Sequence, residues 1–333
     1  MRPARAILAV LAAATLAGCG SLDSPDLVHD LRLLAQRADP ADQVFNLPIN
    51  RDGGGLFDAD GGVDPNAIFA ISAALSSVQP ITVTSLIADP DGGGRSIHYQ
   101  YAICAKFGDG GRCDLTEQNS YALSEGDLVP DGGWAELPVT FTPKLELMAA
   151  ALSDDPYFGA GGFITVPVQL HIKAGDEEVY GYKRLVFTIV LIGDASQTPN
   201  QNPYIPALNL DGDIWSDTLP PVLVDRRAYD IAPVIPTAAE EAYSRPLFTG
   251  GEISFHESWR YNFFATAGGF SSFGSGGSSN IGSGDNPTDS KWTPKASDGP
   301  QNVTYFVVVR DGRGGEGWTV RTAQFAPTVP AKK

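Results

Sequence analysis

Apolar and polar residues alternate over much of the first half of the chain, in short runs that predict β-strands. Residues 27–35 fit either a helix or a strand, and we favour a strand because the segments that follow are strand-like. Residues 144–152 are the best helix candidate, and residues 50–65 predict a polar loop rich in glycine and aspartate. The predicted strands are residues 81–88, 97–104, 135–142, 164–172 and 179–192.

The second half repeats this rhythm after a polar stretch rich in proline and asparagine, and it too ends in a predicted β-hairpin. Residues 268–284, mostly glycine and serine, predict a long flexible loop. Trp259, Tyr261 and Phe263 alternate onto one face, which indicates a core position. The other predicted segments are a strand from 204 to 209, a partly extended passage over 217–246, one or two strands over 253–266, and the hairpin strands 303–309 and 318–325.

The beginning of the chain has the pattern of an export signal. A positively charged start precedes an apolar core over residues 6–16, which is too short to span a bilayer. The segment ends in Leu-Ala-Gly-Cys at 16–19, which resembles the lipobox of bacterial lipoproteins. The resemblance implies cleavage before Cys19, lipidation of Cys19 and a place in the cell envelope, on the outer membrane because Gly20 follows. An ordinary secretory signal with a chance cysteine is the alternative.

Two further resemblances concern the folded part. Residues 259–266, 292–294 and 303–318 resemble the final strands of immunoglobulin-like domains of the PKD or cadherin-like kind, in which a valine-rich strand leads into a D-G-x-G-G turn. Residues 27–40, residues 87–92 and the segment from 101 to Cys113 resemble cell-surface lipoproteins of predatory or fruiting soil bacteria. That kinship implies no particular activity.

Successive strands without alternating helices favour sandwiches over a parallel α/β sheet. We therefore predict an all-β protein in which two tandem immunoglobulin-like β-sandwich domains follow a cleaved lipoprotein signal peptide. The predicted parts are the signal peptide (1–18), a lipidated tether (19–26), domain 1 (27–196), a linker (197–203), domain 2 (204–327) and a tail (328–333).

Cysteine usage fits an oxidising compartment. Cys104 and Cys113 are nine positions apart, and in an exported chain such a pair predicts a disulfide. The two residues are too close in sequence to form the inter-sheet bridge of immunoglobulin domains. We therefore expect a bridge that holds a loop of domain 1.

Composition narrows the partners. The hydrophobic fraction of 43% is ordinary for a globular protein, and the net charge of −16 becomes about −18 without the signal peptide. Such acidity argues against nucleic acid or an anionic membrane surface as a partner. The expected partners are the membrane, through the lipid anchor, and an envelope protein or a polysaccharide. The sequence carries no signal for an oligomeric state.

The candidate chemistry is sparse. Gly312, Gly314 and Gly317 fit the spacing G-x-G-x-x-G, but no helix is predicted to follow, so a hairpin turn is the better interpretation. Phe270 and Phe273, in the Gly/Ser loop, are candidate contacts for a ligand or partner. Closely spaced carboxylates suit calcium, the one cofactor considered, and neither set fits an EF-hand. The calcium candidates are Asp58, Asp60 and Asp64, and Asp211, Asp213 and Asp217.

Together these features predict a lipid-anchored protein of the envelope or cell surface with a non-catalytic binding or structural role. No G-x-S-x-G nucleophile motif occurs in the sequence, and we predict no enzyme activity. Two alternatives remain open: an envelope hydrolase that acts on polysaccharide or peptide, and a periplasmic assembly factor for another envelope protein.

Overall fold

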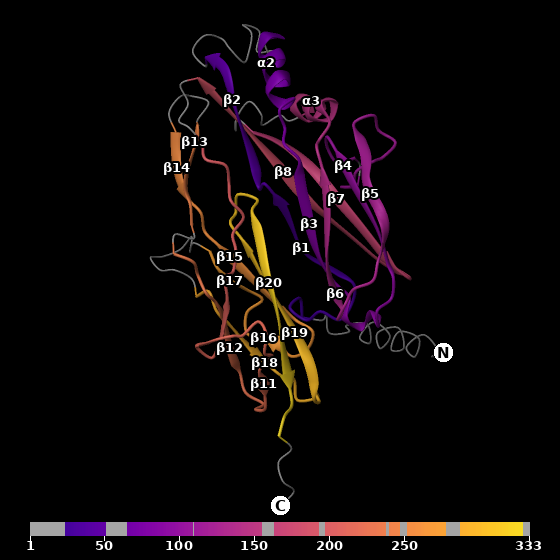
Figure 1. Ribbon diagram of the computed structural model, residues 1–333, viewed down its shortest axis with the longest axis vertical. Coiled ribbons are helices and arrows are strands. Elements are labelled where there is room, and N and C mark those ends of the chain that lie inside the picture. The colour runs from indigo at the N-terminus through magenta and orange to yellow at the C-terminus, as the bar shows by residue number, and fades with distance from the viewer. Residues whose placement is uncertain are drawn as a thin grey trace, which may run out of the picture.

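The computed structural model describes residues 24–50, 65–108, 110–154, 163–192, 197–237, 240–246, 252–277 and 287–328. Strands dominate these residues and form two β-sandwiches, so the all-β, tandem immunoglobulin-like prediction is confirmed (Figure 1). The predicted signal peptide, Cys19 at the start of the tether, and the calcium candidates Asp58, Asp60 and Asp64 lie outside the described residues. Within the described ranges, no helix is long and apolar enough to cross a membrane.

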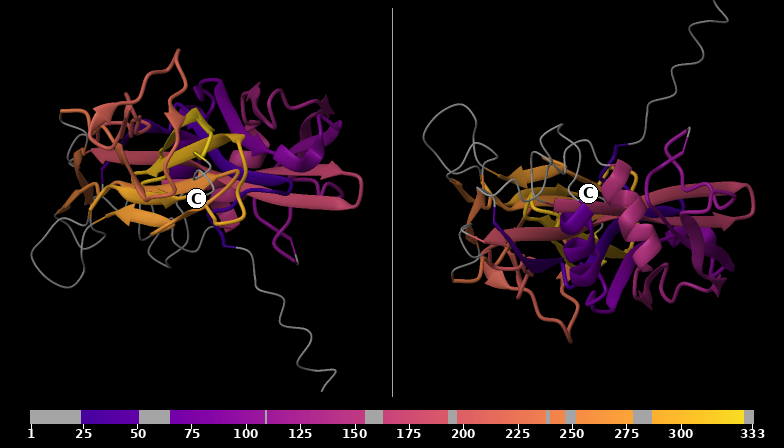
Figure 2. Two further views of the ribbon diagram at one scale, coloured as in Figure 1. Left: turned by 90° about the horizontal axis from the view of Figure 1, so that it is seen from below. Right: turned by 90° about the horizontal axis from the view of Figure 1, so that it is seen from above.

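Domain 1 consists of a three-stranded sheet in the order β1-β3-β6 and a five-stranded sheet in the order β2-β8-β7-β4-β5. Helices α2 (Pro65–Leu75) and α3 (Leu145–Asp154) lie together at one end, as the view from above in Figure 2 also shows. A short 3-10 helix, η2 (Pro90–Gly92), follows β3. The strands are β1 (Arg32–Asp39), β2 (Asp42–Asn50), β3 (Ile81–Ala88), β4 (Ile97–Cys104), β5 (Ser120–Leu128), β6 (Trp134–Phe141), β7 (Phe163–Ala174) and β8 (Glu177–Ile192).

Domain 2 pairs the five-stranded sheets β10-β9-β12-β18-β16 and β11-β20-β19-β15-β17, and the hairpin β13–β14 stands beside them. The first strands are β9 (Leu208–Leu210), β10 (Asp213–Ile214), β11 (Val222–Leu223), β12 (Tyr229–Pro233), β13 (Ala242–Pro246) and β14 (Glu252–His256). The remaining strands are β15 (Arg260–Ala265), β16 (Gly269–Phe270), β17 (Gly274–Gly276), β18 (Ser290–Thr293), β19 (Gln301–Arg310) and β20 (Glu316–Phe325).

The two domains share a topology. In each, the closing hairpin (β7–β8 or β19–β20) lies at the centre of a five-stranded sheet. In each, an early strand pairs in parallel with the last one, β2 with β8 and β11 with β20. The other pairings in these two sheets are antiparallel. The same arrangement arising twice fits two related sandwiches in tandem.

Aromatic residues fill the core of domain 2, as their alternation predicts. Trp259, Tyr261 and Phe263 are 6%, 1% and 0% exposed, and they pack with Trp292 and Tyr305 between the two sheets. In domain 1 the corresponding layer is mainly aliphatic, with Tyr101 and Phe187 among its largest side chains.

A third apolar cluster joins the domains. On β19, Tyr305 and Val307 point into domain 2, whereas Phe306 and Val308 pack against domain 1. Residues on both faces are buried because sheet β11-β20-β19-β15-β17 is covered on one side by its own domain and on the other by sheet β1-β3-β6. The cluster consists of Val28, Leu34, Ala35, Leu86, Ala88, Phe264, Phe306 and Val308.

Several local expectations need correction. The lead-in strand begins at Arg32, and strands β2 and β5 and helix α2 were not expected from the sequence. The predicted flexible loop at 268–284 is wrong for its described part, because β16 and β17 pair there with β18 and β15. The main-chain hydrogen bonds of a sheet need no apolar side chain, so a Gly/Ser segment next to an open edge can complete it.

Candidate functional site at the domain junction

The turn between β19 and β20 reaches across to domain 1 and organises the junction. Arg310 and Glu316 form the last pair of the hairpin, and Gly312 and Gly314 adopt φ values of 80° and 110°. Glycine tolerates such positive φ values, whereas residues with a side chain rarely do. The hairpin-turn interpretation of the G-x-G-x-x-G spacing is therefore confirmed.

Asp311 fixes the shape of this turn from within. Its side chain is buried, and its carboxylate accepts hydrogen bonds from the main-chain N–H groups of Arg313 (2.7 Å), Gly314 (3.0 Å) and Gly315 (2.9 Å). Its second oxygen accepts a bond from Asn200 Nδ2 at 2.8 Å. Burial raises the pKa of the Asp311 carboxyl, and these hydrogen bonds oppose the rise.

The predicted linker bonds to domain 1 as well as to the turn. The main-chain N–H of Asn200 donates to Asp42 Oδ1 at 2.7 Å, and Asn202 Nδ2 donates to the carbonyl of Ala38 at 2.6 Å. Asn202 Oδ1 accepts from the main-chain N–H of Glu316 at 3.1 Å. Burial raises the pKa of Asp42. The linker therefore contributes polar contacts that hold the two domains and the turn together.

A lysine of domain 1 is buried against the same turn. Lys183 on β8 is 4% exposed, lies 3.5 Å from Glu316 Oε1, and donates to the carbonyl of Gly314. Burial lowers the pKa of Lys183, and the nearby carboxylates of Glu316 and Asp311 oppose that shift. The other oxygen of Glu316 accepts from the main-chain N–H of Gln36 on β1 at 3.0 Å.

Arg313 ties the β13–β14 hairpin to the turn. Its guanidinium lies 3.0 Å from Glu241 Oε2 and 3.1 Å from Glu257 Oε1, and it stacks 4.3 Å from the centre of the Tyr243 ring. Glu257 is itself buried, and burial raises its pKa. These contacts place the hairpin opposite the edge of sheet β11-β20-β19-β15-β17.

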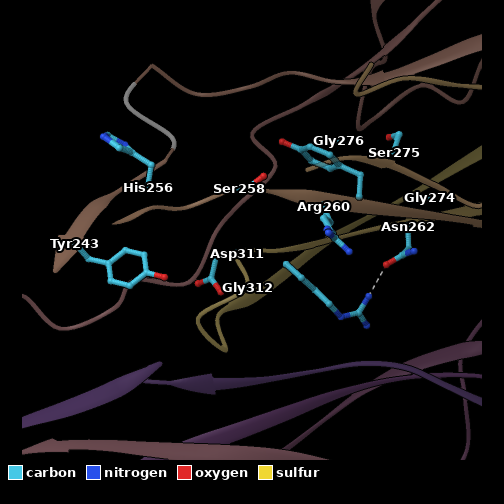
Figure 3. Close-up of a pocket in the computed structure, with 12 residues that line it drawn as sticks. Tyr243, His256, Ser258, Arg260, Asn262, Gly274, Ser275, Gly276, Asp311 and Gly312 are labelled. Carbon is cyan, nitrogen blue, oxygen red and sulfur yellow. Dashed lines mark hydrogen bonds between the residues drawn. The ribbon is translucent and has the colours of Figure 1, made fainter. Parts of the chain in front are cut away.

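A groove of about 760 Å³ lies between this hairpin, the turn and the sheet edge (Figure 3). Figure 3 shows Tyr243 and His256 on one side and Asn262 and Gly274 on the other, with the hydroxyl of Tyr243 directed toward Asp311. The ring of His256 points away from Asp311, at the rim. The lining residues are Tyr243, His256, Ser258, Arg260, Tyr261, Asn262, Gly274, Ser275, Gly276, Arg310, Asp311 and Gly312.

Two arginines give the groove its electrostatic character. Arg310 is held on three sides: it donates to Asn262 Oδ1 at 2.6 Å and to the carbonyl of Leu34 at 3.1 Å, and it lies 3.5 Å from Glu316. Arg260 is exposed, and no hydrogen bond or ion pair of its guanidinium is found among the described residues. Arg310 is therefore fixed by its neighbours, whereas the guanidinium of Arg260 is available to bind a ligand.

The groove was not predicted from the sequence, although the strands that line it carry a signal for it. Arg260 and Asn262 share one face of β15 with Phe264, and Arg310 shares one face of β19 with Phe306 and Val308. On each strand this face changes from apolar, where domain 1 covers it, to polar, where the groove begins. An apolar run on both faces of a strand indicates burial on both sides. The point where one face turns polar marks the edge of that cover.

The predicted disulfide is confirmed: Cys104 and Cys113 are bridged, with their Cα atoms 5.5 Å apart. The main-chain N–H of Cys113 donates to Gln169 Oε1 on β7 at 2.9 Å. The ring of Phe107 within the closed loop lies edge-on to Tyr182 of β8, with 5.1 Å between ring centres. The bridge thus holds the loop against the outer face of domain 1, away from the groove residues.

Of the carboxylates proposed for calcium, the three that the structure describes, Asp211, Asp213 and Asp217, do not converge. Asp211 pairs with Arg227 at 2.6 Å, Asp217 contacts Arg321, and Asp213 is exposed on β10. Within the part of the chain that the structure describes, no group of three or more His, Cys, Asp or Glu residues is placed to hold a metal ion.

The two phenylalanines of the Gly/Ser segment have different environments. Phe270 packs against the core of domain 2, with its ring 5.4 Å from Phe263 and 6.4 Å from Tyr305. Phe273 is 37% exposed and lies edge-on to Phe264 at 5.2 Å. Neither is among the residues that line the groove.

Comparison with known proteins finds no matching family model and no matching curated protein. Among solved structures, red sea bream transglutaminase matches 90% of this chain at 12% identity and a TM-score of 0.20, and the chain spans 32% of that protein's length. AggA, the major subunit of aggregative adherence fimbriae type I from Escherichia coli, matches at 9% identity and a TM-score of 0.22, over 49% of this chain and 99% of its own. The periplasmic chaperone SfaE matches at 11% identity and a TM-score of 0.24, over 88% and 100%. Likenesses of this size carry no conclusion about function.

Proposed function

We propose that this chain is a lipid-anchored protein of the cell envelope, on the outer membrane, that binds a partner at the junction groove without catalysing a reaction. The anchor is the lipidated Cys19 that the lipobox resemblance implies. The partner is an envelope protein or a polysaccharide.

The groove is the observation that carries the proposal. Its volume of about 760 Å³ lies within the range of about 300–1,000 Å³ typical of ligand sites, which often occur where domains meet. Contacts from Leu34, Lys183 and Asn200 fix its walls from outside domain 2. A site assembled from fixed elements needs little ordering when a partner binds, which favours affinity.

The hydrogen bonds that already occupy the carboxylate of Asp311, the acidic group of the groove, favour binding over catalysis. A general base must have a lone pair within hydrogen-bond reach of the substrate. The carboxylate of Asp311 already accepts bonds from three main-chain N–H groups and from Asn200. In this position the carboxylate shapes the turn, and Arg260 and Asn262 face the groove as hydrogen-bonding groups.

Site-specific photocrosslinking in intact cells tests the binding site. A photoreactive residue at Ser258, which lines the groove, should give adducts of higher mass. The same residue at Lys291, exposed on the opposite sheet of domain 2, should give none. Adducts from Lys291 alone, or from neither position, would contradict the proposal.

The anchor has its own test. Cys19→Ala should remove the lipidation site, so the protein should move from the detergent phase to the aqueous phase or remain unprocessed. Each buried CH₂ contributes about 0.8 kcal/mol to membrane binding, so the loss of several acyl chains should change the partitioning strongly. If wild type and variant both partition into the aqueous phase, the chain has no lipid anchor.

A further inference from the structure

We infer that the groove takes an acidic saccharide, with a sugar carboxylate bound by Arg260 and sugar hydroxyls bound by the polar groups beside it. This inference rests on the proposed binding function and names the ligand class of the same groove.

The charge of the groove contrasts with that of the whole chain. The protein carries a net charge of −16, yet two arginines converge on one polar hollow. Asp311, the acidic group of the lining, has both of its oxygens occupied by four donors. A carboxylate in the groove would therefore meet guanidinium N–H donors, and Arg–carboxylate pairs form short bidentate hydrogen bonds.

Arg260 and Arg310 differ in how many of their N–H donors are free to bind a ligand. A guanidinium has five N–H donors; the hydrogen bonds of Arg310 to Asn262 and Leu34 use two of them, and its Nε lies 3.5 Å from Glu316. Arg310 thus offers its remaining donors from a fixed position. Arg260 is exposed and has no side-chain partner among the described residues, so its whole fork is available for a carboxylate.

Hydroxyl-binding groups lie next to the arginines. Because Arg310 donates to Asn262 Oδ1, the Nδ2 donors of Asn262 are left for a ligand. Ser258 lines the same groove, and its hydroxyl can both donate to and accept from a sugar hydroxyl.

The lining favours a saccharide over an acidic peptide. Peptide binding commonly depends on apolar anchor residues that fill a pocket. None of the residues that line this groove is aliphatic, and three are glycines. Of its two tyrosines, Tyr261 is 1% exposed, and Tyr243 is stacked with Phe255 and covered by Arg313. The lining matches a ligand rich in hydroxyls and negative charge.

The test measures binding of polygalacturonate to the full-length protein in detergent at low salt. The neutral comparison is the methyl ester of the same polymer, which keeps the backbone and hydroxyls but lacks the carboxylates. We expect the ester to bind at least tenfold more weakly. We also expect Arg260→Gln to weaken polygalacturonate binding at least tenfold, and Arg260→Lys to restore part of it, because lysine keeps the charge but not the planar fork.

Lys291→Gln is the matched control, since it removes one exposed positive charge from the opposite sheet of domain 2. It should change the affinity less than twofold. Equal binding of polymer and ester, equal losses in Arg260→Gln and Lys291→Gln, or no binding at all would overturn the inference. If Ser258 still gives photocrosslinked adducts in any of these cases, the binding function stands and only the ligand class is wrong.

Discussion

Replacing Asp311 by alanine tests how strongly the β19–β20 turn depends on one buried carboxylate. The change removes the acceptor for the N–H groups of Arg313, Gly314 and Gly315 and for the amide of Asn200. Asp311 is 2% exposed, so these donors lose their partner away from bulk water. Leaving a buried donor unsatisfied costs about 1–3 kcal/mol each.

The expected loss is smaller than the sum over four donors. Removing the carboxylate also removes the cost of burying its charge, the same burial that raises the pKa of Asp311. We expect Asp311→Ala to lower the free energy of unfolding by about 3–5 kcal/mol, the range for removing one partner of a buried charged group, because buried Lys183 also loses one of its nearby carboxylates. Asp311→Asn keeps one acceptor oxygen but sets an NH₂ group against a donor, so it should lose about 1–2 kcal/mol.

Urea unfolding followed by tryptophan fluorescence measures both losses. Asp213→Ala is the control, because Asp213 is exposed on β10, and it should stay within about 0.5 kcal/mol of wild type. If Asp311→Ala unfolds within about 1 kcal/mol of wild type, the carboxylate does not hold the turn and the argument for a fixed junction fails.

Three further predictions concern the apolar layer, the disulfide and pH. Phe306→Ala should destabilise the protein by about 3–5 kcal/mol in the same assay, because its fully buried ring packs between the domains; a loss below 1 kcal/mol would contradict that packing. Replacing Cys104 and Cys113 by alanine should cost about 2–3 kcal/mol, since the bridge closes a short loop in the unfolded chain; unchanged unfolding would argue against it. Burial raises the pKa of Asp42 in the folded protein. The protonated carboxyl therefore stabilises the fold at low pH, and this stabilisation is lost as the pH rises through the raised pKa. Asp42→Asn should therefore gain melting temperature relative to wild type as pH increases from 4 to 8, and a difference that does not vary with pH would refute this.

Strands rich in β-branched and aromatic residues that alternate over part of their length, and that end at a turn signal or a cysteine, were predictable from local sequence. Residues 81–88 and 97–104 match β3 and β4, and the closing hairpins were found to within a few residues. Strand β5 carries the weak pattern of an exposed edge, with one buried residue, Ser120, at its start. β17 consists of glycine and serine and forms because β15 offers it an open edge. Such pairing depends on tertiary structure, which local sequence does not encode.

The groove was harder to predict than the fold. Asp311 and Arg313 belong to a turn whose glycines were recognised, but the contacts of these side chains lie more than a hundred residues away, at Asn200, or on the separate hairpin, at Glu241 and Glu257. The burial of Lys183 could not be predicted either, since nothing in the β8 sequence distinguishes a buried lysine from a solvated one. Asp211 and Asp217 are close in sequence and were predicted to share a calcium ion, but each pairs with a separate arginine.

The central claim is that the junction groove is where this protein binds its partner. Hydrogen–deuterium exchange of the full-length protein, with and without a solubilised cell-envelope extract that contains both its proteins and its polysaccharides, tests that claim most directly. The account predicts slower exchange in peptides that cover residues 256–262 and 272–277, which line the groove. It predicts no change over β5 or β18, which belong to sheets whose residues do not line the groove. Protection confined to β5 or β18, or no protection at either part of the groove, would contradict it.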